Sequence, residues 1–384
     1  MIFNHTIRNG LAGIRHTNER IHKNNYKELP PHVIMETIHA TGFLNERLTF
    51  HSATAERDIK IDYVKVTGPV ISTLGKIQAY NSLLGNTIAS DSVELTNSSA
   101  KEVQSLFDHV TVRRTDEETS QLSNIQAKKN INISRASVKK GIRSLSENVS
   151  IHQSTVGDVK AWKDITLTCS SARTVESTFG NVTVAKTDQN SLVSVKAWGN
   201  ITITEAAVSG KIKSTFGTVK AHRSALQNVQ AKKDIELTNS SAKDVKSSLG
   251  SVTVHQTDGT MRSFSHISAK NAAFIKNSAV ENITLHVDPS RQAVLNLTNT
   301  KVAEKIAIKV DGAIRPESNW FFASLKQVAR IEPKPKKPAA VGFTLLIQAD
   351  TMPKNILFEG FEANEIAMQK TDDGILVTGK QKGR

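Results

Sequence analysis

Cysteine and aromatic residues are scarce in this chain of 384 residues. It has a single cysteine, Cys169, so no disulfide bond can form within it. Phenylalanine, tryptophan and tyrosine together make up 5% of the residues, so the core must consist mainly of small and branched aliphatic side chains. Such side chains fit stacked β-strands better than a thick globular core. Because no segment approaches 18 apolar residues, the sequence also predicts no membrane-spanning helix.

Motifs of catalysis and of metal binding are missing as well. The sequence has no phosphate-binding glycine loop, no zinc-ligand spacing and no nucleophile elbow. Six of the twelve histidines lie within residues 1–52, at irregular spacings that match no zinc site. We therefore assign no catalytic, cofactor-binding or metal-binding residue, and expect a protein that is not an enzyme.

The start of the chain lacks the uninterrupted apolar segment of a secretory signal. On this ground we expect a cytoplasmic protein, with export by a signal-independent route left open.

Positive charge exceeds negative charge. Fifty lysines and arginines stand against 36 acidic residues, which gives a formal net charge of +14. An excess of this kind favours partners such as anionic glycans, anionic surfaces or nucleic acid. The same lysines also serve solubility and keep exposed strand edges from pairing with other chains.

Two short units alternate along the chain. The first reads [V/I]-x-A-x-x-[D/N]-[I/V]-x-[L/I], as in "VKAWKDITL" from Val159 and "VKAWGNITI" from Val195. The second reads [V/I]-x-S-[T/S]-[F/L]-G-x-V-x-[V/A], as in "VESTFGNVTV" from Val175. Most units begin 16 or 17 residues after the previous one, and together they start at Ala53, Val70, Thr87, Val103, Ile125, Ile142, Val159, Val175, Val195, Ile212, Val229, Val245, Ile267 and Ile283.

Apolar residues alternate within each unit, which is the periodicity of a β-strand with one buried face. Strands this short do not fold alone, but copies in matching register can pair with the coils on either side. We therefore predict an all-β fold, a single-stranded β-solenoid (a β-helix, expected to be right-handed) of about 14 short coils with capping segments. Successive coils should lie about 4.8 Å apart.

The repeat also predicts the domain organisation. Residues 1–52 are expected to form an N-terminal tail and cap, and residues 53–288 the solenoid. Residues 289–384 should form a C-terminal β-rich cap or small module, with a proline- and lysine-rich linker at 332–338.

Two sets of residues recur at expected corners of the coil. One set, Gly75, Gly180, Gly217 and Gly250, is expected to need a positive φ angle or a close backbone approach. The other includes Cys169, which takes the place of Asn97 and Asn239 in the repeat. This equivalence indicates a turn residue and not a reactive thiol.

Every fourth coil is longer, with extra residues after the Thr-Asp pairs that begin at Thr115, Thr187 and Thr257. Loops on one edge are typical of a functional face, and duplication of a four-coil block explains them equally well. Their acids, Asp116, Asp188 and Asp258, should be about 19 Å apart. A glycoside-cleaving carboxylate pair needs roughly 5 to 9.5 Å, so this ladder does not form one.

Outward-facing residues supply a candidate ligand face. Trp162 and Trp198 occupy equivalent positions two coils apart, so their rings should lie about 10 Å from each other. Exposed indoles suit stacking on sugar rings or bases, and lysines suit an anionic ligand. The alternative is that each indole packs over its own sheet. The face consists of Trp162, Trp198, Lys160, Lys196, Lys128 and Lys232.

The repeat over residues 53–288 resembles that of a bacterial adhesin-like family of β-solenoids of unknown function. Members of that family often follow a signal or membrane anchor, which the start of this chain does not show. The resemblance implies a non-enzymatic, structural or binding protein that presents a rigid face to an anionic or glycan partner. Two alternatives remain: a polysaccharide-active β-helix enzyme, and a solenoid that assembles into homo-oligomers or filaments through its ends or edges.

Overall fold

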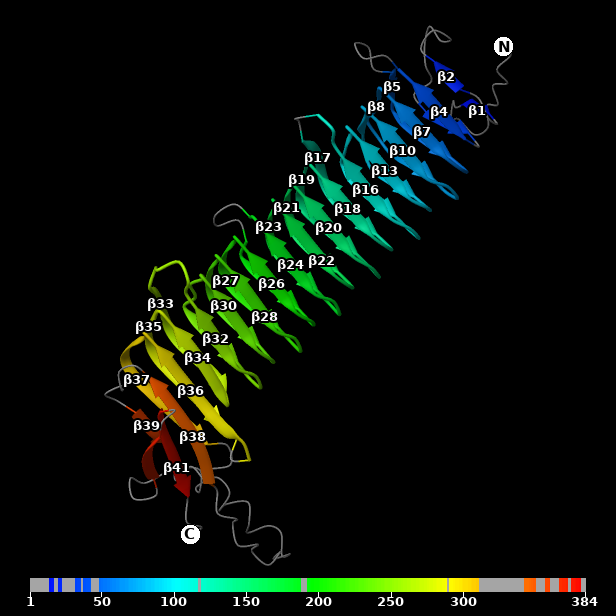
Figure 1. Cartoon of the computed structure of the whole chain (residues 1–384). Helices are drawn as coiled ribbons and strands as arrows, with labels where there is room; N and C mark the ends of the chain where they lie inside the picture. The colour runs from blue at the N-terminus through cyan, green and yellow to red at the C-terminus, as the bar shows by residue number, and fades with distance from the viewer. Residues whose placement is uncertain are drawn as a thin grey trace, which may run out of the picture. The chain divides into compact units, whose positions relative to one another are not determined.

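The protein is a β-solenoid of about 14 turns built from stacked parallel strands (Figure 1), as the sequence predicts. The structure, a computed structural model, describes residues 14–16, 20–22, 32–35, 37–42, 48–116, 119–187, 192–288, 290–310, 342–349, 356–359, 366–371 and 374–380. Every regular element in these ranges is a β-strand. The chain divides into two compact units, residues 1–199 with 203–209, and residues 200–202 with 210–384.

In the first unit, each coil contributes one strand to each of two long parallel sheets. The first face consists of β1 (Ile14–His16), β3 (His32–Met35), β6 (Ser52–Ala55), β9 (Val70–Ser72), β12 (Thr87–Ala89), β15 (Glu102–Ser105), β17 (Ser120–Ala127), β19 (Ala136–Ser144), β21 (Thr155–Ala161), β23 (Ser171–Ser177) and β25 (Ser194–Ala197). The second face consists of β2 (Arg20–His22), β4 (Ile38–Thr41), β7 (Ile59–Asp62), β10 (Ile77–Tyr80), β13 (Val93–Thr96), β16 (Val110–Arg113), β18 (Ile131–Ser134), β20 (Val149–His152), β22 (Ile165–Thr168) and β24 (Val182–Ala185).

A short third face closes the N-terminal coils. It contains β5 (Leu48–Phe50), β8 (Val64–Val66), β11 (Leu83–Leu84) and β14 (Ser99–Ala100). In later coils the corresponding residues begin a longer first-face strand, and a register shift after Val138 of β19 marks the bend. The division between the two units passes through β26 (Ile201–Thr204) and β27 (Ala207–Ser214).

The second unit has the same two faces. Its first-face strands are β29 (Ala225–Ala231), β31 (Asp244–Ser247), β33 (Arg262–Lys270), β35 (Ser278–Val287), β37 (Lys301–Val310) and β39 (Ile356–Glu359). Its second-face strands are β28 (Val219–His222), β30 (Ile235–Thr238), β32 (Val252–His255), β34 (Ala272–Lys276), β36 (Gln292–Thr298) and β38 (Gly342–Ala349). β41 (Gly374–Lys380) pairs with β38 in antiparallel fashion, and β40 (Ile366–Thr371) pairs with β41 in the same way.

The register of the strands agrees with the predicted repeat. In the first unit the starting residues of successive repeats pair from Ala53 to Val195. In the second unit they pair from Val229 to Ile283. Alternate residues point inward: Ile165 and Leu167 are fully buried, for example, while the residue between them is exposed. The core is therefore a column of aliphatic side chains.

A buried serine explains why two kinds of unit alternate. The Ser177 hydroxyl donates a hydrogen bond to the Lys163 carbonyl of the preceding coil (2.6 Å) and accepts one from the Gly180 amide (2.9 Å). Units of the first kind have alanine in place of this serine, as at Ala161. The serine of one coil thus satisfies a carbonyl at the corner of the coil before it. The same pair of bonds is made by Ser72, Ser105, Ser144 and Ser247.

The corner glycines are needed for space and not for a positive φ angle. A Cβ atom on Gly75, Gly180 or Gly250 would overlap backbone atoms of the preceding coil. Of the described glycines, only Gly259 has a positive φ. Of the two alternatives expected for these glycines, the close backbone approach is confirmed at these three positions, and none of the three has a positive φ.

Left-handed residues form a separate column, one in most coils, just after the second-face strand. Cys169 has a φ of 49°, as has Asn97, and Asn239 has 48°, which confirms Cys169 as a turn residue. Asparagine tolerates this conformation better than most residues. The Asn239 amide oxygen also accepts hydrogen bonds from the backbone and hydroxyl of Thr257, 2.7 and 3.0 Å away.

The left-handed asparagines anchor the long loops. Asn97 binds Thr115 in the same way as Asn239 binds Thr257, with both donors of the threonine on one amide oxygen. Cys169 stands at this position before the loop that begins at Thr187, and its thiol is a poor acceptor. Accordingly, the Thr187 hydroxyl is buried without a hydrogen-bond partner. Asp188 of this loop and the linker at 332–338 lie outside the described residues.

Parallel stacking extends past the residues in which the repeat is clear. Strands β3 and β4, which precede residue 53, pair with β6 and β7, and β36 and β37, which follow residue 288, pair with β34 and β35. The division into tail, solenoid and C-terminal module stays a prediction.

Candidate binding site at an aromatic corner

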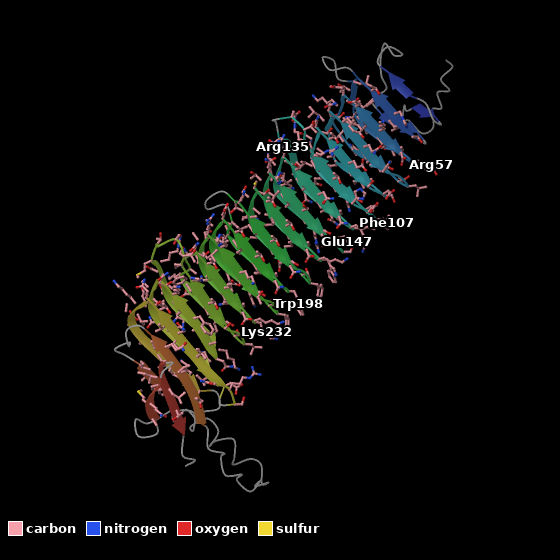
Figure 2. All side chains as sticks on the ribbon, viewed as in Figure 1. Arg57, Phe107, Arg135, Glu147, Trp198 and Lys232 are labelled. Atoms are coloured by element: carbon pink, nitrogen blue, oxygen red, sulfur yellow. The ribbon has the colours of Figure 1, made fainter. Side chains whose placement is uncertain are left out.

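Large apolar side chains are exposed at the corner where first-face strands turn into second-face strands. In the first unit they include Leu74, Phe107, Trp162, Phe179 and Trp198. We call these residues the corner stripe. Figure 2 shows Phe107 and Trp198 along the same edge of the first unit, and Arg135 on the opposite edge. Strand periodicity does not bury these side chains, because each belongs to the turn between two strands.

Three rings of the corner stripe form a continuous stack on consecutive coils. The ring centroids of Trp162 and Phe179 are 4.5 Å apart with the planes tilted by 52°. Those of Phe179 and Trp198 are 5.6 Å apart with a tilt of 48°. The coils are held together beneath the rings, since the Phe179 amide donates to the Trp162 carbonyl (2.8 Å). The stack thus joins the two tryptophans that the sequence predicted to be equivalent.

The stacked rings remain largely in solvent. Trp162 is 45% exposed, Phe179 50% and Trp198 43%. Aromatic pairs of this geometry contribute about 0.5–1.5 kcal/mol beyond the area they bury. The stack therefore stabilises its own conformation and still leaves about half of each ring accessible.

Phe179 was missed in the sequence because corner length differs between the two units. Trp162 is the first residue after the buried Ala161, whereas Phe179 is the second residue after the buried Ser177. The corner that follows the buried serine is one residue longer than the corner that follows the buried alanine. As a result, Phe179, the second residue of the longer corner, lies next to Trp162, the first residue of the shorter one. The recurrent "TFG" and "SLG" of that unit were the available signal.

Two of the predicted lysines take the place of a tryptophan in the repeat. Lys128, in the first unit, is exposed at the corner. Lys232, in the second unit, places its ammonium nitrogen 4.0 Å from the ring centroid of Phe216, within the range of a cation–π interaction. From Lys128 to Lys232 this corner position thus carries either an indole or an ammonium group, whereas the two preceding units of the same kind have Glu56 and Ser90 there.

The other two predicted lysines lie on the first face and not at the corner. Lys160 forms an ion pair with Glu176 (3.3 Å), and Glu176 is also the register partner of Lys196. The outward column beside the aromatic stack therefore alternates in charge. Exposed ion pairs of this kind contribute little to stability and leave both groups hydrated.

Two acids of the long loops that the structure describes, Asp116 and Asp258, are engaged in ion pairs. Asp116 binds Arg114, and Asp258 accepts hydrogen bonds from Arg262 at 2.6 and 2.9 Å. These bonds hold the pKa of Asp258 down, to about 2. The guanidinium group of Arg173 likewise lowers the pKa of Asp158. A general acid of glycoside cleavage needs a raised pKa, and in the described part of the chain the shifted carboxyl groups all move downward.

The described ranges contain no group of three histidine, cysteine or acidic side chains placed to hold a metal ion. They also contain no helix with the length and apolar character needed to cross a membrane.

Comparison with known proteins identifies no family for this chain. No family model, no curated protein and no solved structure gives a significant match. The resemblance to the adhesin-like family is therefore supported only in its coarser part, the β-solenoid repeat.

Proposed function

We propose that the protein is a non-enzymatic binding scaffold that presents the Trp162–Phe179–Trp198 stack to an acidic polysaccharide. The observation that carries this proposal is the stack itself, three half-exposed rings on three consecutive coils. Because the backbone beneath each ring is fixed by the coil stack, the rings are organised before a ligand arrives. Preorganisation of this kind reduces the entropy lost on binding.

A linear carbohydrate fits this surface for geometric reasons. The rings advance by one coil, about 4.8 Å, at each step, which is comparable with the length of one pyranose residue. The CH face of a pyranose packs against an indole, which combines an apolar body with a polar N–H group. A chain of sugars could therefore contact successive rings along the solenoid axis.

The charge of the chain supports an acidic ligand. The formal net charge is +14. Lys128 precedes Trp162 by two coils, and Lys196 lies two residues before Trp198, on the strand β25 that leads into the corner. These ammonium groups flank the stack, where carboxylate or sulfate groups of a polysaccharide would be attracted.

The proposal is tested by titrating the full chain with polygalacturonate and measuring the affinity by calorimetry. Replacing both tryptophans (Trp162→Ala with Trp198→Ala) should weaken binding by at least about tenfold, since stacking on one aromatic ring is worth about 1–3 kcal/mol. The matched control is Leu74→Ala, which removes an exposed side chain of the same corner outside the stack. This control should leave the affinity unchanged.

Other ligands and readouts separate the alternatives. Neutral dextran should bind more weakly than polygalacturonate, and a single-stranded oligonucleotide that bound more tightly would replace the glycan in the proposal. Equal affinities of the wild type and the double variant would exclude the stack as the binding site. Shortening of the polysaccharide would indicate an enzyme, and filaments in electron micrographs would indicate self-assembly.

A further inference from the structure

A groove crosses the first face of the second unit. It spans four neighbouring parallel strands, β31, β33, β35 and β37, so outward-facing residues at the same repeat position form columns across it. Its middle column contains the small residues Ser268, Thr284 and Ala307, all of which are buried. Longer side chains stand on both sides of this column, and the groove has a volume of about 670 Å³.

The lining of the groove is mainly cationic. Three lysines, Lys246, Lys305 and Lys309, lie on it together with two histidines, His266 and His286. The lining has one carboxylate, that of Glu304, which accepts a hydrogen bond from the side-chain amide of Asn282 (2.7 Å). The lysines come from β31 and β37 and the histidines from β33 and β35, so the fold and not one flexible segment brings them together.

The environment of His266 shows that the lysine charges converge in this groove. Burial lowers the pKa of His266, and the charges of Lys305, Lys309 and Lys246 lower it further. Only Asp244 acts in the opposite direction. The burial and the lysine charges that disfavour the imidazolium form of His266 mark a place where an added negative charge would be stabilised.

We propose that this groove binds an oxyanion, that is, a phosphate, sulfate or carboxylate group of a ligand. The lysines supply charge, and the hydroxyl groups of Ser268 and Thr284 can donate hydrogen bonds from the floor. The site lies in the second unit and does not include any residue of the corner stripe. The oxyanion proposal can therefore be tested independently of the polysaccharide proposal.

Oxyanion binding should be coupled to protonation of His266. A bound anion favours the imidazolium form, so the pKa of His266 rises on binding and the affinity increases as the pH falls through that pKa. The charged and titratable groups that line the groove around His266 or act on it are Asp244 and Lys246 on β31, His286 on β35, and Glu304, Lys305 and Lys309 on β37.

The test follows the histidine ring resonances of the full chain by NMR, with His266 assigned through His266→Gln. Inorganic phosphate, inorganic sulfate and glucuronate are added separately at constant ionic strength, with chloride as the reference. At least one oxyanion should give saturable shifts of the His266 signals and a higher pKa, and comparison of the three identifies the preferred group. Replacing Lys246 and Lys305 by glutamine should weaken that binding by about tenfold or more.

A matched control separates this site from general attraction to a cationic protein. Lys213→Gln removes an exposed lysine of β27, in the second unit, that is not part of the groove. It should leave the affinity unchanged. The proposal is overturned if no oxyanion raises the pKa of His266, if chloride gives the same response, or if Lys213→Gln weakens binding as much as the groove variant does.

Discussion

Replacing Cys169 by asparagine should repair a missing anchor of the second long loop. Asn97 and Asn239 occupy the equivalent position and hold the threonine that begins the loop, 18 residues later in each case. Cys169 has the same left-handed backbone but leaves the Thr187 hydroxyl buried without a partner. The Cys169→Asn variant should therefore acquire both hydrogen bonds that Asn239 makes with Thr257.

The expected gain is about 2 kcal/mol. A left-handed residue other than glycine costs roughly 1–2 kcal/mol, and asparagine relieves part of this cost. Each new hydrogen bond contributes about 0.5–1.5 kcal/mol net, and satisfying a buried hydroxyl removes a penalty of similar size. Some of this gain is lost in ordering the asparagine side chain, which keeps the total near the lower end of the sum.

Native-state hydrogen exchange is the appropriate assay, because repeat proteins need not unfold in a single step. The Thr187 amide should become protected in Cys169→Asn, by a factor of at least about ten for each 1.4 kcal/mol gained. Cys169→Ala is the control, since it removes the thiol without adding an acceptor. In the reverse experiment, Asn239→Cys should expose the Thr257 amide. Equal exchange of the Thr187 amide in Cys169→Asn and Cys169→Ala would show that the asparagine forms no such anchor.

Two further results are expected. Ser177→Ala should destabilise the first unit by about 1–3 kcal/mol, because the Lys163 carbonyl then loses its donor, and thermal unfolding followed by circular dichroism measures this. The ion pair of Asp258 with Arg262 should contribute to loop stability above the ordinary pKa of an aspartate, near 4, and lose that contribution as the pH falls through about 2, the pKa of Asp258 in the folded state. Exchange rates of the loop amides between pH 4 and pH 2 test this, and Arg262→Gln should move the transition to higher pH.

Much of the fold could be predicted from the repeat, because each short strand must bury alternate side chains against identical neighbours. That requirement sets the register, and the starting residues of the units pair as expected from Ala53 to Val195 and from Val229 to Ile283. The turn position of Cys169 could also be predicted, because Asn97 and Asn239 occupy the equivalent place in their units. The third face was missed because its strands, such as β11 (Leu83–Leu84), are too short to show a period.

The candidate sites were harder to predict from the sequence than the fold was. Trp162 and Trp198 were found because they share one unit type, but Phe179 belongs to the other type and its place depends on the length of the corner. The oxyanion groove combines residues from Lys246 to Lys309, and its strand β37 follows the last predicted unit, which starts at Ile283. The pairing of β37 with β35 shows that its lysines lie beside the outward side chains of the preceding coils.

If the corner stripe binds a sugar chain through its indoles, the binding must change the exposure of Trp162 and Trp198, which tryptophan fluorescence measures. The third tryptophan, Trp320, is first replaced by phenylalanine, so that Trp162 and Trp198 alone emit. Acrylamide quenching is then measured with and without saturating polygalacturonate. The polysaccharide should shield both indoles and lower the quenching constant severalfold. Unchanged quenching in the presence of bound polysaccharide would contradict binding through the indoles.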